Sequence, residues 1–171
     1  MNEKLKKIIP SLFLLPIALF IIFNRGDFIP ILDHVNLLIH EGGHGIFKVF
    51  GKFIYTFGGT LMQIILPVLF IITYARMKKL FAVQLSLIWL AQNMMNISVY
   101  VSDARDRKLP LLGGNKVYHD WTYLLNEMNL ILYDKLIGSI IYYAAAAILI
   151  ITLLYPLFKT DYKEVKLDLN L

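Results

Sequence analysis

The chain has 171 residues, of which 58% are hydrophobic and 17% charged, and its mean hydropathy is +0.63. This composition is too apolar for an ordinary soluble domain and predicts a polytopic membrane protein. The lack of cysteine excludes disulfides, thiolate zinc sites and cysteine nucleophiles. The net charge of +5 comes from basic clusters beside apolar runs, which favours lipid headgroups over nucleic acid as a partner.

Five apolar runs predict the organisation of the chain. They cover residues 8–23, 29–50, 53–75, 80–102 and 136–158, and a polar stretch, 103–134, precedes the last run. We therefore expect an all-α fold, in which residues 1–171 form a single integral membrane domain. This domain would be a polytopic transmembrane helix bundle of about five segments, with a short interfacial helix in the polar stretch.

The first run follows a basic start, as the apolar part of a signal peptide does. Asn24-Arg25-Gly26-Asp27 stands where a small-residue cleavage site would be needed, so we expect a retained helix.

The second run carries His40-Glu41-Gly42-Gly43-His44 within otherwise apolar sequence. Residues four apart project from one face of a helix, so His40 and His44 can hold one zinc ion, with Glu41 beside it to take a proton from water. The alternatives are chance, or hydrogen bonds to neighbouring helices. Ionisable groups inside a span are costly and mark functional sites, which favours a metal. Asp33 or Asn36, one or two turns earlier, could orient a histidine through its second nitrogen or simply lie near the membrane interface.

The third run opens with Phe57-Gly58-Gly59-Thr60, which predicts irregular rather than helical backbone at this point. Gly58 and Gly59 could form a loop that lines a cavity, and the segment could then be re-entrant. Equally, the two glycines could serve the packing of helices.

The fourth run places Asn93, Asn96, Tyr100 and Asp103 on one helical face. Such a stripe inside a span faces the bundle interior or a water-filled cavity, although hydrogen bonding between helices is an alternative role.

The polar stretch contains a predicted turn at Gly113-Gly114 and then His119-Asp120. From Asp120, a candidate N-cap, apolar residues follow helical spacing and predict a helix on the membrane surface: Trp121, Leu124, Leu125, Met128 and Leu132. The last run has no ionisable group and predicts a packing helix.

If all five runs span, the downstream ends of the second and fourth runs reach the same side of the membrane, together with the loop that carries His119. Because zinc needs a third protein ligand with one position left for water, Asp103 is the first candidate. His119 and Asp120 are rivals, as ligand or as orienting residue, unless they only belong to a loop and a helix cap.

The buried HEGGH helix and the later span with asparagines ahead of an aspartate resemble the site-2 protease family of intramembrane zinc metalloproteases. The resemblance covers about residues 30–105. It implies His40 and His44 as zinc ligands, Glu41 as general base, and Asp103 as third ligand. The family commonly has Pro between the Asn and the Asp and Gly after the Asp, and this chain lacks both. It resembles a compact, divergent member without an appended sensor domain.

The resulting hypothesis is zinc-dependent hydrolysis of peptide bonds in a membrane-protein substrate within or at the edge of the bilayer. Asn93 or Asn96 would hold the unwound substrate strand or the developing oxyanion. Small size and family analogy suggest a bacterial cytoplasmic membrane. The alternatives are a non-catalytic membrane protein that binds or assembles a partner and a transporter with a midplane metal site; too few histidines are present for a di-iron hydroxylase.

Overall fold

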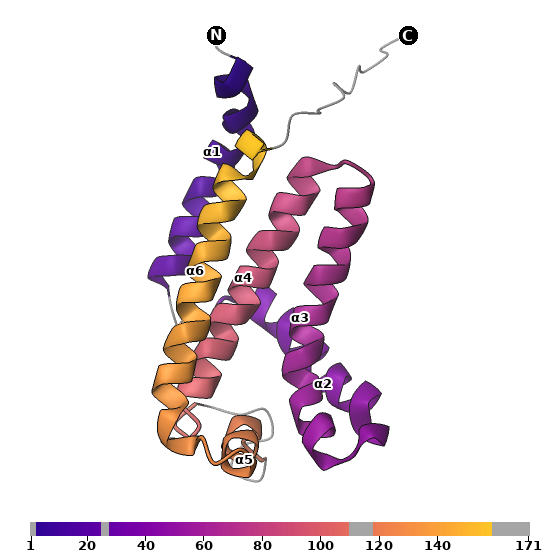
Figure 1. The fold of residues 1–171 in the computed structure, drawn as a ribbon, viewed down its shortest axis with the longest axis vertical. Coiled ribbons are helices and arrows are strands. Elements are labelled where there is room, and N and C mark those ends of the chain that lie inside the picture. The colour runs from indigo at the N-terminus through magenta and orange to yellow at the C-terminus, as the bar shows by residue number, and fades with distance from the viewer. Residues whose placement is uncertain (1–2, 25–27, 110–117, 159–171) are drawn as a thin grey trace.

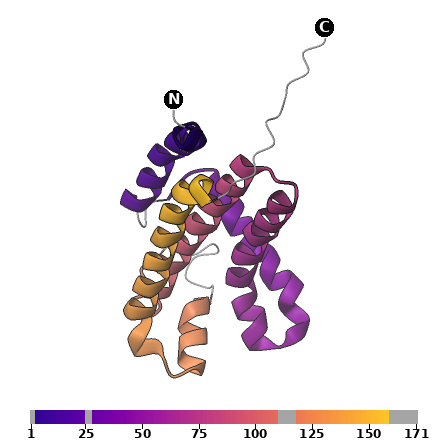
Figure 2. The same cartoon turned by 45° about the horizontal axis from the view of Figure 1, so that its top comes forward.

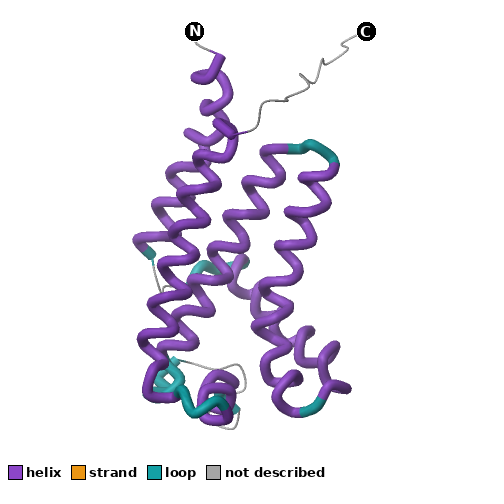
Figure 3. The backbone as a smooth tube through the Cα atoms, viewed as in Figure 1, coloured by secondary structure: helices purple, strands orange, loops and turns teal. Residues whose placement is uncertain are grey.

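The computed structural model describes residues 3–24, 28–109 and 118–158, and every element in these ranges is helical (Figures 1 and 3). The predicted all-α fold is thus confirmed for the described part of the chain. The elements are α1 Glu3–Phe23, α2 Leu32–Phe47, the 3-10 turn η1 Lys48–Phe50, α3 Lys52–Arg76, α4 Leu80–Ser102, α5 Asp120–Glu127, the 3-10 turn η3 Ile131–Tyr133 and α6 Asp134–Phe158.

Within the described residues, three segments are long and apolar enough to cross a membrane, namely Lys52–Arg76, Leu80–Ser102 and Ile131–Leu157. They correspond to the third, fourth and fifth predicted runs and indicate a membrane protein. The first run corresponds to α1, whose described apolar part, Ser11–Phe23, is shorter. The second corresponds to α2, which has 16 residues and several polar side chains. The prediction of about five spans is therefore confirmed only for these three.

Helix α4 lies at the centre of the bundle, with α3 on one side and α6 on the other (Figures 1 and 2). Helix α1 packs along α6, and α2 packs along α3. The end of α2, the start of α3, the end of α4 and the short α5 gather at one end of the bundle (Figure 1). The pieces that the sequence analysis expected to meet therefore lie together at one end of the bundle.

Two apolar clusters hold the helices together. One joins α1, α4 and α6 through buried residues Leu14, Ala18, Ile21, Ile88, Ala91, Met95, Ala145 and Leu149. The other joins the end of α4 to α5 through Ile97, Val101, Ala104, Trp121, Leu124 and Leu125. The second cluster fixes α5 against the bundle at the end where the polar residues of α2 lie.

Helix α3 is continuous through Gly58 and Gly59, so the predicted irregular or re-entrant opening is wrong. The glycines serve close packing of α2 and α3 instead. A Cβ on Gly58 would lie 2.8 Å from the Cβ of Phe47 and 2.9 Å from the carbonyl oxygen of Gly43. A Cβ on Gly43 would in turn overlap the carbonyl oxygen of Gly58. Small residues at such a crossing let two backbones approach closely.

Helix α2 is tied to α4 by polar side chains. Asp33 Oδ1 accepts hydrogen bonds of 2.6 Å from the side-chain amides of Gln92 and Asn96. Asn36 donates to Gln92 at 2.6 Å and accepts from the indole of Trp89 at 2.8 Å. The polar stripe of α4 therefore faces the bundle interior, as predicted, and its hydrogen bonds replace apolar packing between these two helices.

Helix α5 forms where a short helix was predicted, but it begins one residue earlier, at Asp120, and its surroundings differ from the prediction. Its apolar face, including Leu124 and Leu125, is buried against the protein rather than facing lipid. The helix ends at Glu127, so the predicted face does not continue to Leu132. Its N-cap is His119, whose Nδ1 accepts from the backbone N–H of Thr122 at 3.3 Å, and not Asp120. The predicted turn at Gly113-Gly114 lies outside the described residues.

Candidate metal centre

Helix α2 presents the two predicted histidines on one side, toward α3 and α5. The imidazoles of His40 and His44 lie edge to face with ring centroids 4.8 Å apart. His40 fits only because residue 59 of α3 is glycine, since a Cβ there would lie 2.5 Å from the Nε2 of His40. The second glycine of α3 thus makes room for a ring, not for a loop.

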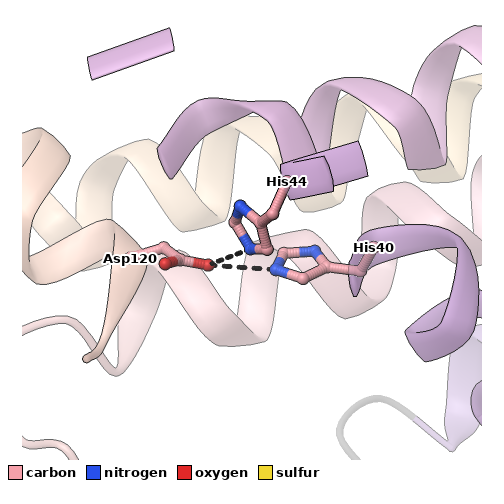
Figure 4. A group of neighbouring side chains, drawn as sticks. All are labelled: His40, His44 and Asp120. Carbon is pink, nitrogen blue, oxygen red and sulfur yellow. Dashed lines mark hydrogen bonds and ion pairs between the residues drawn. The ribbon is translucent and has the colours of Figure 1, made fainter. Parts of the chain in front are cut away.

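The third member of the site is Asp120, the first residue of α5. Its Oδ2 lies 3.0 Å from Nε2 of His40 and 3.2 Å from Nε2 of His44 (Figure 4). The three side chains are only 8%, 12% and 14% exposed for His40, His44 and Asp120. Among the described residues, these are the ones whose candidate ligand atoms gather within 4.8 Å of one another.

The outer nitrogens of both rings are held by oxygen atoms. Nδ1 of His44 lies 2.8 Å from the backbone carbonyl oxygen of Tyr55, and Nδ1 of His40 lies 2.9 Å from Oε1 of Gln63. Carbonyl oxygens only accept hydrogen bonds, so the partners assign the proton to Nδ1 in each neutral ring. Each Nε2 then carries a lone pair that points toward Asp120.

Two imidazole lone pairs and a carboxylate oxygen therefore converge with no hydrogen between them. Such a group repels itself unless a cation or an added proton lies between its members. Ligand atoms in a tetrahedral zinc site with bonds of about 2.0–2.1 Å are roughly 3.3 Å apart, close to the observed separations from Asp120. The donor set of two histidines and one carboxylate is also a known catalytic zinc set, and orientation of the outer nitrogens by oxygen acceptors is typical of ligating histidines. The residues therefore fit a divalent metal ion.

The charge on Asp120 suits this role. Burial raises the pKa of Asp120, but in the absence of a metal ion the hydrogen bonds and positive charge that His40 and His44 supply when protonated outweigh it and hold the pKa below its usual range. The carboxylate is ionised at neutral pH and available as a ligand.

Asp103, the first-choice third ligand from sequence, does not join the metal group in the structure. Its two carboxylate oxygens accept hydrogen bonds of 2.9 Å from the backbone N–H groups of Lys108 and Leu109. Asp103 therefore stabilises the loop after α4, because backbone N–H groups that have no partner in a helix need other acceptors. The rival candidate Asp120 takes the place next to the histidines.

His119, the other rival, also has a structural position. Its Nδ1 caps α5, and its Nε2 lies 3.5 Å from Oδ2 of Asp103. Burial lowers the pKa of His119, more than the neighbouring Asp103 raises it, so the ring is neutral at pH 7. With Nδ1 as acceptor, the proton of the neutral ring is on Nε2, facing Asp103.

The two predicted substrate-binding residues are engaged within the bundle. Asn93 donates to the backbone oxygen of Trp89 at 3.1 Å and accepts from Gln63 at 3.3 Å. Asn96 donates to Asp33. In the structure both amides bridge helices. The hydrogen bonds that join Asp33 and Asn36 to other helices go to α4, and Gln63, rather than either of these predicted candidates, lies at hydrogen-bond distance from Nδ1 of His40.

Glu41 and Tyr100 complete the surroundings of the group. Glu41 is exposed, and its charge acts on both His44 and Tyr100. The hydroxyl of Tyr100 accepts from the backbone N–H of Asp120 at 3.1 Å, and its ring packs 4.4 Å from that of His119. Glu41 is thus close to the metal group and accessible, whereas Tyr100 holds the start of α5.

Sequence reasoning missed Gln63, Tyr55, Gly59 and Tyr100 as parts of the site. A polar residue at position 63 inside an apolar run, the Gly58-Gly59 pair and the place of Tyr100 in the polar stripe were the available signals, whereas the sequence does not indicate a role for the backbone carbonyl of Tyr55. No family model, curated protein or solved structure matches the chain. The interpretation of the site therefore rests on its residues and their geometry.

Proposed function

We propose that the chain is a zinc-dependent peptidase that cleaves membrane-protein substrates at the edge of the bilayer. His40, His44 and Asp120 would hold the ion, and Glu41 would act as general base. The observation that carries this proposal is the convergence of Nε2 of His40 and Nε2 of His44 on one carboxylate oxygen of Asp120, at 3.0 and 3.2 Å.

The number and type of ligands favour a catalytic role over a structural one. Structural zinc sites have four protein ligands, whereas catalytic sites commonly have three and keep one position for water or substrate. A zinc ion bound there would polarise a carbonyl group and make water a stronger nucleophile at neutral pH. The same donor set also binds Fe²⁺ in other proteins, so the experiment must determine which metal is bound.

Glu41 has the position and freedom that a general base needs. It follows the proposed ligand His40 directly on the helix, and its side chain is exposed, with no ion pair to another residue in the described part of the chain. The carboxylate would take the proton from the attacking water and deliver it to the leaving amine, so that Glu41 returns to its ionised form.

The location of the group favours a substrate bond near the membrane surface. Tyr55 is the fourth residue of α3, and Tyr100 is the third residue from the end of α4. With a rise of 1.5 Å per residue, both lie within about 5 Å of the ends of their spans. A peptide bond near the end of a transmembrane segment is also easier to unwind than one at its centre, where freed backbone groups find no water. An integral position in a bacterial cytoplasmic membrane remains part of the proposal by analogy.

The test combines metal content with peptide cleavage. The chain is purified in detergent, its metals are measured by elemental mass spectrometry, and cleavage is followed with peptides that span a transmembrane end. We expect one zinc per chain in the wild type, loss of zinc in His44→Ala, and retained zinc with lost cleavage in Glu41→Gln.

Matched controls separate the site from general damage. His34→Ala removes an exposed histidine on the same helix, and Glu127→Gln removes an exposed glutamate at the end of α5. Both should keep zinc and activity. Iron in place of zinc would contradict the metal assignment, and full cleavage by Glu41→Gln would contradict the mechanism in favour of a partner-binding role.

A further inference from the structure

A chain of side-chain amides connects the backbone of α4 to the first histidine of the metal group. Asn93 Nδ2 donates to the backbone oxygen of Trp89 at 3.1 Å, and Asn93 Oδ1 accepts from Gln63 Nε2 at 3.3 Å. Gln63 Oε1 then lies 2.9 Å from Nδ1 of His40. Counted over the whole residue, Asn93, Gln63 and His40 are 0%, 8% and 6% exposed, so these contacts are shielded from water.

The direction of each hydrogen bond between Trp89 and His40 follows from the first one, in which the backbone oxygen of Trp89 accepts. A backbone carbonyl can only accept, so the amide of Asn93 must turn its NH2 group toward Trp89 and its oxygen toward Gln63. Gln63 must then turn its NH2 group toward Asn93 and its oxygen toward His40. His40 is left with one arrangement that satisfies Gln63 in the neutral ring, which is a proton on Nδ1.

We propose that Gln63 and Asn93 are positioning residues that keep a proton on Nδ1 of His40, so that Nε2, which faces Asp120, is the nitrogen left for the metal ion. This inference rests on the proposed metal centre. Neither amide contacts the ion in this scheme; both act through His40. This arrangement increases the affinity for the metal ion, because a neutral imidazole with its proton on Nε2 cannot bind the ion through Nε2 until that proton moves.

His44 provides an internal comparison. The backbone oxygen of Tyr55 holds its Nδ1 directly at 2.8 Å, without an intervening side chain. Loss of the amide chain should therefore change the tautomer of His40 and leave that of His44 unchanged. A role of Gln63 in helix packing alone would not produce this difference between the two rings.

A second buried glutamine offers a matched control. Gln84 of α4 is fully buried and donates to Ser11 at 2.8 Å and to the backbone oxygen of Thr152 at 2.9 Å. Gln84→Leu and Gln63→Leu make the same chemical change and remove hydrogen bonds between helices in both cases. Only Gln63→Leu removes a partner of the metal group.

The experiment reads the tautomers in the metal-free protein by nitrogen NMR of histidine-labelled chain in detergent micelles, with resonances assigned from His40→Ala and His44→Ala spectra. Zinc affinity is measured in parallel by competition with a chelator. We expect Gln63→Leu to lose the Nδ1–H signal of His40 and to bind zinc about 10- to 100-fold more weakly, the usual effect of removing such a partner. Gln63→Glu, which keeps an acceptor oxygen, should retain the tautomer, and Asn93→Leu should show a partial loss.

The outcomes separate this inference from the proposed function. If Gln63→Leu and Asn93→Leu keep the His40 tautomer and match Gln84→Leu in zinc affinity, the positioning role is overturned while the metal centre stands. If the wild type binds no zinc, the proposed function fails, and the tautomer measurement still decides the role of the amides. Should Gln63→Leu not fold, Gln63→Glu and Asn93→Leu carry the test.

Discussion

Substitution of Gly59 by alanine should damage the metal centre without touching a ligand. The added Cβ would lie 2.5, 2.6 and 2.7 Å from Nε2, Cε1 and Cδ2 of His40. Non-bonded carbon atoms stay about 3.5–4.0 Å apart, so the ring must retreat by roughly 1 Å. Functional constellations tolerate displacements of only about 0.5 Å. We therefore expect zinc affinity to fall by about tenfold or more, as it does when the surroundings of a ligand are disturbed.

The effect on folding should be smaller than the effect on binding. Alanine in place of glycine inside a helix favours folding by about 1 kcal/mol, while overpacking costs about 1–3 kcal/mol. The net loss is therefore between about zero and 2 kcal/mol, which leaves most of the protein folded. Chelator competition measures zinc affinity, and thermal unfolding in detergent measures stability.

Gly45→Ala is the control, since a Cβ on Gly45 of α2 meets nothing within 4 Å. It should bind zinc like the wild type and unfold at the same or a higher temperature. If Gly59→Ala binds zinc as tightly as Gly45→Ala, His40 is not a zinc ligand in the position next to Gly59.

Three further results are expected. Asp120→Asn should lose zinc, whereas Asp103→Asn should keep it and only lower stability, and the reverse pattern in elemental analysis would restore Asp103 as third ligand. Leu125→Ala, at a fully buried position of α5, should lower the free energy of unfolding by about 2–5 kcal/mol. It should also weaken zinc binding, because α5 carries Asp120. Unchanged zinc affinity would show that the packing of α5 does not affect the site. A chelator should lower the melting temperature of the wild type, because zinc at 100 times its dissociation constant stabilises by about 2.7 kcal/mol, and should leave that of His44→Ala unchanged.

The helices of this chain could be predicted because hydrophobic runs and the spacing of polar residues follow directly from the helical repeat. Residues 80–102 were predicted as one segment and form α4 with the same bounds. The prediction of irregular backbone at Gly58 and Gly59 was wrong because helix packing outweighs the local preference of glycine for irregular backbone. In an apolar span, a helix satisfies every backbone group internally. The absence of side chains at Gly58 and Gly59 lets α2 approach α3 closely.

The pair His40 and His44 could be predicted because both ligands lie on one helix. The third position could not, because it depends on how a separate helix packs. Asp103 and Asp120 both lie at the same end of the bundle. The burial of Leu124 and Leu125 against α4 places Asp120 beside the histidines, while the backbone of the loop after α4 holds Asp103. The role of Gln63 depends on the same kind of information, since its partners come from α2 and α4.

The separation of the site along the chain has a consequence for biosynthesis. His40 of α2 and Asp120 of α5 are 80 positions apart, with two of the candidate spans between them. A nascent chain that has inserted α2, α3 and α4 carries both imidazoles and Glu41, the proposed general base, but does not yet have Asp120, the proposed third ligand. Metal uptake, and any hydrolysis that depends on it, would then begin only after the ribosome has passed α5. The order of synthesis itself would thus keep a protease inactive while its own helices, still unpacked, resemble its substrates.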